Sequence, residues 1–286
     1  MFDLHSHLLP GLDDGATSVA MSLEMARLYE DHGIDCVACT PHILPGLYPN
    51  SGPKIHRAVC ALQARVDDAG IDLLLVSGAD NHIRKDFLDR LHDDHLLPIG
   101  ASRYVLVELP QDIAPARLEG FFHELLLADY VPILTHPERL GWIGKDADLI
   151  ARLAAQGVWM QVTSGALRGV FGRHARYWAE RMLCEGLVHI LASDAHDVKR
   201  RPPDLPIGHA IAEQLVGREE AHHLVVTRPA GVLLNKEPDT LPSPHGVSSV
   251  MQLRGTNETA PNHPTSFIHR GIGQRMRHIF SHEYRR

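Results

Sequence analysis

The stretch Phe2-Asp3-Leu4-His5-Ser6-His7 determines how the rest of the chain is interpreted. Phe2 and Leu4 alternate with polar residues, as in a short β-strand, so that Asp3, His5 and His7 fall on one face. Two imidazoles spaced in this way at the end of a strand can hold one metal ion together. The alternative is a pair of surface histidines near the N-terminus. The metal interpretation is favoured because the same pattern, an apolar strand followed by a histidine or carboxylate, recurs along the chain.

Seven apolar runs predict strands, in the opening stretch and at 34–40, 73–77, 104–107, 131–135, 158–162 and 188–192. Helical spacing of apolar residues predicts helices between them, from Thr17 or Ser18 to about 32 and at about 53–69, 86–92, 115–128, 146–156 and 173–184. Strands that are apolar throughout are typical of parallel sheets buried on both faces. The expected fold is therefore α/β, a distorted (β/α)7 barrel of the TIM type, and the alternative is an open doubly wound sheet.

The composition excludes several classes of protein. The chain has 286 residues, 44% hydrophobic and 22% charged, which fits a soluble globular protein. A net charge of -7 argues against nucleic-acid binding. No stretch is long enough to span a bilayer and no basic-then-apolar leader begins the chain, so a cytoplasmic location is expected. The sequence leaves the oligomeric state open.

The four cysteines give little sign of redox or zinc chemistry. Cys36 and Cys39 form a C-x-x-C inside a predicted strand, where an odd spacing sends the two side chains to opposite faces. A shared metal site or disulfide between them is therefore not expected.

The C-terminal region differs from the rest. From Glu237 onward, prolines interrupt a stretch rich in Ser, Thr and Asn that has no apolar periodicity. We expect two parts: a barrel over 1–236 and a largely disordered, basic tail over 237–286, with a short helix possible near 274–284. The tail could serve solubility alone, or it could bind an acidic partner or a membrane surface.

Histidines and carboxylates lie at or just after the ends of the predicted strands: His5, His7, His42, Asp80, Glu108, His136, Asp194 and His196. In a β/α barrel these strand ends form one face, and that face carries the active site. Any one of these residues alone is more often a solvated side chain than a ligand, but together they form a convincing set. Imidazole and carboxylate without thiolate suit manganese, zinc or iron. Two or three ions fit the number of ligands, and such clusters activate water for attack on phosphate esters.

Several short motifs follow one another in a recognisable order: D-L-H-S-H, L-D-D-G, T-P-H, G-A-D, V-E-L, T-H-P-E-R, and S-D-A-H followed by R-R-P-P. Over residues 1–236 the chain resembles the polymerase-and-histidinol-phosphatase (PHP) superfamily. More narrowly, it resembles the bacterial capsule-type tyrosine-protein phosphatases of that superfamily. The resemblance implies a phosphatase of phosphotyrosine proteins, whose partner is a bacterial tyrosine kinase of capsular or exopolysaccharide synthesis and export.

The resemblance also implies roles for individual residues. A trinuclear centre, commonly with Mn2+, would use His5, His7 and Asp194 for one ion, Glu108 and His136 for a second, and His42, His196 and Asp14 for the third. Asp80 would bridge two ions, and His196 is a candidate proton donor. Two arginines would grip phosphate. Arg139 of T-H-P-E-R matches the first, and Arg201 matches the second, with Arg200 as its competitor.

The chain departs from the family pattern at one place. Asp80 stands where the family usually has Glu, and Asn81-His82 replaces the usual aromatic pair. These changes put the spacing of a shared metal site and the access of substrate at that rim in question. Two other functions stay open: a small-molecule phosphatase of the histidinol-phosphatase type, and a non-catalytic regulator that binds a partner.

Overall fold

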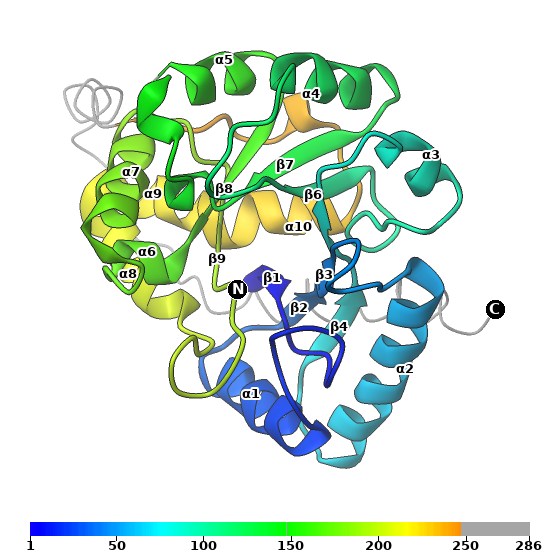
Figure 1. Ribbon diagram of the computed structural model, residues 1–286. Helices are drawn as coiled ribbons and strands as arrows, with labels where there is room; N and C mark the ends of the chain where they lie inside the picture. The colour runs from blue at the N-terminus through cyan, green and yellow to red at the C-terminus, as the bar shows by residue number, and fades with distance from the viewer. Residues whose placement is uncertain (147, 247–286) are drawn as a thin grey trace.

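All seven predicted strands are present in the computed structural model, which describes residues 1–146 and 148–246 (Figure 1). Two further short strands, β3 (His42–Ile43) and β5 (Asp80–His82), follow the second and third of them. The seven are β1 (Phe2–Ser6), β2 (Cys36–Cys39), β4 (Leu74–Ser77), β6 (Tyr104–Glu108), β7 (Val131–Thr135), β8 (Trp159–Thr163) and β9 (Ile190–Ala192).

The strands form two parallel sheets that curve into a distorted barrel, which confirms the expected fold. One sheet has the order β1-β2-β4 and the other the order β3-β5-β6-β7-β8-β9. The chain passes from the first sheet to the second where β2 leads into β3 and β4 leads into β5. On the other side the Asp194 N–H donates to the His5 carbonyl and the His7 N–H donates to the Ala195 carbonyl, each at 2.9 Å. These bonds join β1 to the chain just beyond β9.

The predicted helices are also present, with shifted starts in two cases. α1 begins after Ser18, whose side chain caps it by accepting from the Met21 N–H. α4 and α5 each begin three residues later than the apolar spacing predicts. The helices between strands are α1 (Val19–Asp31), α2 (Gly52–Asp68), α3 (Phe87–His92), α4 (Leu118–Leu127), α5 (Leu149–Ala155), α6 (Ser164–Leu167) and α7 (Gly172–Cys184).

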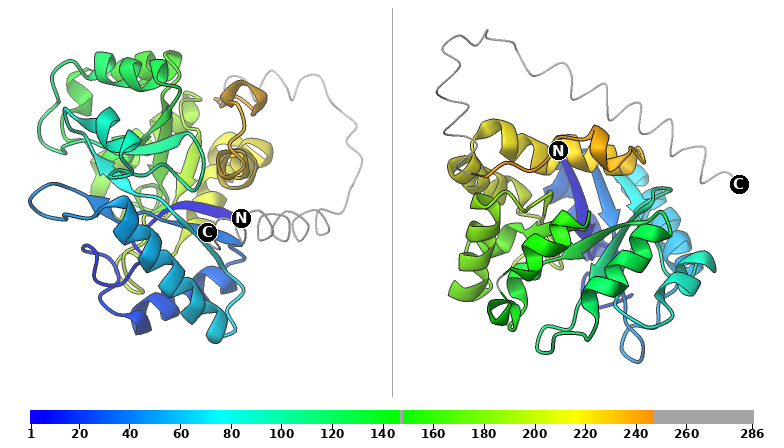
Figure 2. Two further views of the ribbon diagram at one scale, coloured as in Figure 1. Left: turned by 90° about the vertical axis from the view of Figure 1, so that its right-hand side faces the viewer. Right: turned by 90° about the horizontal axis from the view of Figure 1, so that it is seen from above.

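Between β9 and residue 234, where the sequence patterns predict no element, the chain forms four helical segments. They are α8 (Leu205–Val216), α9 (Arg218–His222), a π-helical turn (His223–Thr227) and α10 (Arg228–Leu233). The last three cross the end of the barrel at which the strands begin (Figure 2, right). Their apolar side chains close the core there. No helix in the described part of the chain has the length and apolar character needed to cross a bilayer.

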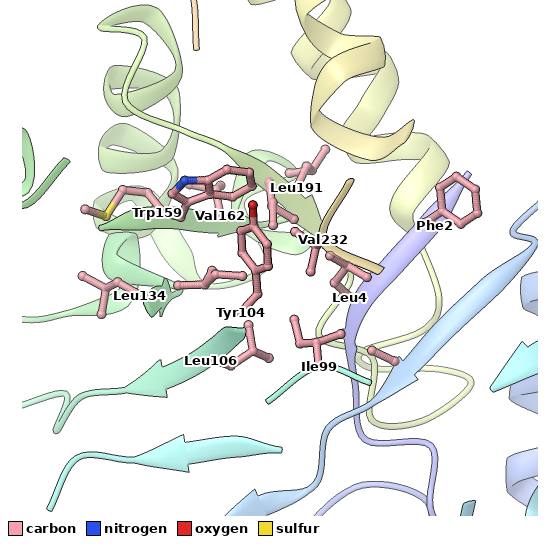
Figure 3. Packing of buried hydrophobic residues seen from close by; sticks show 14 of the residues in the cluster. Phe2, Leu4, Ile99, Tyr104, Leu106, Leu134, Trp159, Val162, Leu191 and Val232 are labelled. Atoms are coloured by element: carbon pink, nitrogen blue, oxygen red, sulfur yellow. The ribbon is translucent and has the colours of Figure 1, made fainter. Parts of the chain in front are cut away.

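Aromatic and branched side chains fill the barrel interior (Figure 3). The rings of Tyr104 and Trp159 meet edge to face at a centroid distance of 5.0 Å. Leu4 from β1 and Val232 from α10 lie close to them in the same cluster. The core therefore fills the half of the barrel near the strand starts and leaves the strand ends to polar side chains.

Cys36 and Cys39 both lie buried in β2. Among the described residues, no group of side chains that could hold a metal ion includes either one.

Residues 237–246, at the start of the region expected to be largely disordered, are ordered and pack against the barrel. A 3-10 turn (Pro238–Thr240) leads to Leu241, which is buried against Gly231 of α10. The fully buried Arg228 donates through Nε to the Pro242 carbonyl at 2.7 Å and pairs with Glu220 at 2.8 Å. The predicted tail over 247–286 and its possible helix near 274–284 lie outside the described residues.

Candidate metal centre

The nine candidate metal ligands converge at the end of the barrel where the strands end. β1 supplies His5 and leads to His7, and Asp14 follows in the loop before α1. β3, β5 and β6 supply His42, Asp80 and Glu108, and the chain just beyond β7 and β9 supplies the rest. Ligand atoms within 4.8 Å of one another form four overlapping groups: His7-Asp14-His42-His196, His5-His7-Asp80, His5-His136-Asp194 and His42-Asp80-Glu108.

The first part of the centre brings His5, His7 and Asp194 together. The Nε2 atoms of the two histidines lie 3.2 Å apart. Oδ1 of Asp194 lies 3.4 Å from Nε2 of His5 and 3.2 Å from Nε2 of His7. All three side chains are buried, and three ligand atoms therefore face one point.

Asp80 lies at the middle of the centre. Its Oδ2 atom is 3.5 Å from His5 Nε2, 3.5 Å from His42 Nδ1 and 3.7 Å from His136 Nε2. The other oxygen, Oδ1, accepts a hydrogen bond from Thr135 at 3.2 Å. Asp80 belongs to two of the four ligand groups, which is the position that a bridging carboxylate needs.

The remaining ligand atoms lie toward the mouth of the barrel. Nδ1 of His42 is 3.2 Å from Oε2 of Glu108, and Nε2 of His136 is 4.0 Å from Oε1 of the same carboxylate. Oδ1 of the half-exposed Asp14 lies 3.6 Å from Nε2 of both His42 and His196.

The chemistry of these donor atoms fits bound cations. His42 Nδ1, Asp80 Oδ2 and His196 Nε2 are buried and have no hydrogen-bond partner within the described residues. Polar atoms buried without a partner cost free energy and are rare in native proteins. A cation contacting each of them removes that cost.

The carboxylates of the centre stay ionised despite their burial. Burial alone would raise the pKa of Asp194, but the charges of Arg201 and His5 hold it well below its usual value. Burial and the nearby Glu108 would likewise raise the pKa of Asp80, and the surrounding histidines lower it. Burial and the charge of His7 lower the pKa of His196, which favours the neutral imidazole that binds metals. Ionised carboxylates packed this closely need positive charge between them.

Two arginines reach the centre from one side. Nη1 of Arg139 donates to Oδ2 of Asp194 at 2.7 Å, and Arg201 donates to the same oxygen. Both guanidinium groups lie over the ring of Phe171, at 4.5 Å and 5.5 Å from its centroid. Arg200 is exposed, so the structure favours Arg201 over Arg200 as the second arginine.

Comparison with known proteins identifies the family of this chain. Residues 1–234 match the family model described as capsular polysaccharide synthesis, CpsB/CapC. The chain belongs to the CpsB/CapC family. It is 36% identical to the tyrosine-protein phosphatase YwqE of Bacillus subtilis over 201 residues, which cover 70% of this chain and 79% of YwqE. It is 24% identical to the tyrosine-protein phosphatase CpsB of Streptococcus pneumoniae over 245 residues, which cover 82% of this chain and 99% of CpsB.

A solved structure supports the same family. The chain superimposes with a TM-score of 0.81 and 33% identity on a structure from a study of B. subtilis YwqE and S. pneumoniae CpsB, described as metal-dependent tyrosine phosphatases. The match covers 86% of this chain and 99% of the other. The resemblance expected from the sequence motifs is thereby confirmed.

Two residues in the CpsB/CapC barrel orient the candidate ligands, although the sequence patterns did not single them out. Asp13 accepts from His7 Nδ1 at 2.7 Å and from the His42 N–H at 2.9 Å, and Gln161 Oε1 accepts from His5 Nδ1 at 2.7 Å. The two bonds to ring nitrogens leave Nε2 of His7 and Nε2 of His5 facing the centre. Burial would lower the pKa of His7, but Asp13 and Asp194 raise it to about 10. Asp13 is visible in the L-D-D-G motif, whereas no sequence signal marks Gln161.

The backbone is strained at two ligand positions of this family member. His136 has φ of 36° and Asp194 has φ of 53°, both in the left-handed region that non-glycine residues seldom adopt. His136 comes directly after β7, and Asp194 comes two residues after the end of β9. The turn at each position redirects the side chain toward the centre. Such strain is concentrated at functional sites because the surrounding structure has to maintain it.

Asn81 and His82, where the chain departs from the family pattern, face in different directions. Asn81 points away from the centre, and its Nδ2 donates to the carbonyls of Ala79, Leu97 and Leu106. His82 faces the centre, with Nδ1 at 3.5 Å from Oε2 of Glu108. His82 is thus a further histidine at the rim beside Glu108.

Proposed function

We propose that this protein hydrolyses phosphotyrosine monoesters on a protein substrate, using metal ions held at the strand ends. The observation that carries the proposal is the position of Asp194. One of its oxygens faces His5 and His7, and the other accepts from Arg139 and Arg201. Metal ligands and phosphate-binding arginines therefore meet at one carboxylate. Membership of the CpsB/CapC family and the names of its relatives support the same activity.

The residues of the site fit two or three ions. We assign His5, His7 and Asp194 to one ion, Glu108 and His136 to a second, and His42, His196 and Asp14 to a third, with Asp80 between them. Donors that are imidazole and carboxylate suit Mn2+ best, and Zn2+ or iron as alternatives. The bound ions supply Lewis-acid chemistry, since they make water acidic enough to act as a nucleophile and they neutralise phosphate charge.

The protein's own groups bind and orient the phosphate. Arg139 and Arg201 would turn from Asp194 to the phosphate oxygens, where their planar donors fit the charge that develops during displacement. Phe171 holds both guanidinium groups on the same side of the centre. A phenolate leaves readily, so a strong general acid is not essential. We assign His196 mainly to metal binding, because its lowered pKa leaves little of the protonated form near pH 7.

We further propose that the substrate is a tyrosine kinase of capsular or exopolysaccharide synthesis. The description of the family as one of capsular polysaccharide synthesis supports this partner. The proposal includes a cytoplasmic location, where ATP-dependent phosphorylation takes place. We take residues 1–246 as the catalytic unit and the remainder as a separate C-terminal segment.

One experiment tests the activity and separates it from the alternatives. The purified protein is analysed for metal content and assayed with a phosphotyrosine peptide and with histidinol phosphate, before and after chelation and Mn2+ addition. We expect bound metal, hydrolysis of the peptide, loss on chelation and recovery with Mn2+. Preference for histidinol phosphate would indicate a small-molecule phosphatase. Absence of both metal and hydrolysis would indicate a non-catalytic regulator.

A further inference from the structure

A cleft of about 400 Å³ opens beside the metal centre, between the loop that follows β3 and the chain around α3. Its walls combine rigid and aromatic groups of the loop with basic side chains on the opposite side. They include Pro45, Tyr48, Pro49, Arg84, Arg90 and His95. Leu47, on the same loop, is 62% exposed.

The cleft has an excess of positive charge. Arg84 and Arg90 are its charged lining residues, and none of the described residues that line it has a carboxylate. Asp86, just outside the lining, pairs with both arginines, so the two cations share one anion. Lys54 adds a third cation, because its Nζ donates to Oδ1 of the lining residue Asn50 at 2.7 Å.

The second cleft described for this molecule is electrostatically different. It measures about 660 Å³ and lies between α4 and the chain before α5. Three carboxylates line it together with three cations, and Arg152 there pairs with Glu119 at 2.7 Å and with Asp146 at 2.6 Å. Its charges therefore balance, and substitutions in this cleft are a suitable control for substitutions in the basic cleft.

The basic cleft is continuous with the metal centre through Tyr48. The Tyr48 ring lines the cleft and stacks on the ring of the ligand candidate His42, with centroids 5.6 Å apart and planes at 13°. On the opposite side, Arg84 lies two residues after His82, which contacts Glu108. The cleft therefore borders the entrance through which a phosphorylated tyrosine would reach the centre.

We propose that the cleft binds the side chain of an aspartate or glutamate next to the phosphotyrosine of the substrate polypeptide. The proposal rests on the proposed function, and it adds a sequence preference to it. Arg84 and Arg90 attract the carboxylate, and Tyr48 and the prolines contact the backbone beside it. Exposed charge pairs are weak one by one and are screened by salt, so the preference is moderate and falls as ionic strength rises.

The test compares two phosphotyrosine peptides of equal length with the full-length Mn2+-loaded protein. One has Asp or Glu on both sides of the phosphotyrosine, and the other has Asn or Gln there. We expect kcat/KM to be about three- to tenfold higher for the acidic peptide at low salt. The ratio between the two peptides cancels any general change in the metal centre.

Two variants locate the preference. Arg84→Gln/Asp86→Asn/Arg90→Gln removes the two lining arginines and the carboxylate they share, and should lower the ratio toward one. Arg117→Gln/Lys145→Gln removes two cations from the balanced cleft and should retain the wild-type ratio. Equal rates for the two peptides with wild type, or an unchanged ratio in the triple variant, would overturn the proposal. Hydrolysis of p-nitrophenyl phosphate but of neither peptide would instead contradict the peptide substrate itself.

Discussion

Truncation of the chain at two positions tests whether residues 237–246 stabilise the barrel. A protein ending at Lys236 loses Leu241 and the Pro242 carbonyl, whereas a protein ending at Gly246 keeps both. Leu241 is only 8% exposed, and Pro242 accepts the 2.7 Å bond from the fully buried Arg228. The shorter protein should therefore be much less stable than the longer one.

The magnitude follows from these two contacts. Burial of a leucine side chain contributes about 1.5–3 kcal/mol. A hydrogen bond to a charged group contributes about 1.5–3 kcal/mol, and its loss leaves a buried guanidinium N–H without an acceptor. The sum is about 3–6 kcal/mol of the free energy of unfolding. For a domain of this size such a loss lowers Tm by roughly 6–24 °C.

Thermal unfolding at one fixed Mn2+ concentration measures the effect, because bound ligand itself raises Tm. Leu241→Ala should reproduce a large part of the loss, whereas Leu234→Ala, at a position that is 39% exposed, should cost little. Equal Tm values for the two truncated proteins would refute the reasoning and show that residues 237–246 contribute nothing to the barrel.

Three further predictions concern the site and the core. Arg139→Ala and Arg201→Ala should each lower turnover of phosphotyrosine substrate about a hundredfold to a thousandfold and leave metal content unchanged; wild-type turnover in either would remove that residue from the site. Asp80→Asn should lose at least one ion by elemental analysis, because a negative charge between cations disappears, whereas Asp80→Glu should keep metal and much activity. Full metal in the Asn variant together with a damaged Glu variant would mean that Asp80 only shapes its loop. Burial and the charge of Arg228 lower the pKa of His189 to about 3, and the Met160 N–H donates to its Nδ1 at 3.2 Å. Since the unfolded state takes up this proton near pH 6.5 and the folded state does not, stability from His189 is present above pH 6.5 and declines as pH falls toward 3. His189→Gln should therefore lose less stability than wild type between pH 7 and 5 in urea unfolding, and parallel losses would contradict this assignment.

The strands, and the convergence of the candidate ligands at their ends, could be predicted because both have local signals. Apolar runs mark the strands, and His5, His42 and Glu108 lie at strand ends, where barrel topology brings them together. Residues whose role depends on a distant contact had no such signal. Gln161 lies inside an apolar strand and is recognisable only by its bond to His5, 156 positions away in the chain.

The order of residues 237–246 went unpredicted for a similar reason. Frequent prolines and polar residues after Glu237 are typical of disorder, and local composition does not reveal a carbonyl that satisfies a buried arginine. The burial of Arg228, which makes an acceptor from elsewhere in the chain necessary, is visible only in the structure.

The joint between β1 and β9 has a consequence for how the ring of strands is closed. Only a few backbone bonds hold the two ends of the ring together, among them those of His7 and Asp194. His5, His7 and Asp194 are also the ligands that we assign to one ion. If these residues hold an ion, it would link the first strand to the chain just beyond the last strand across the same seam. Metal loading would then lock the ring of strands shut. His5 can meet its partner Asp194 only after the ribosome has synthesised the chain as far as residue 194.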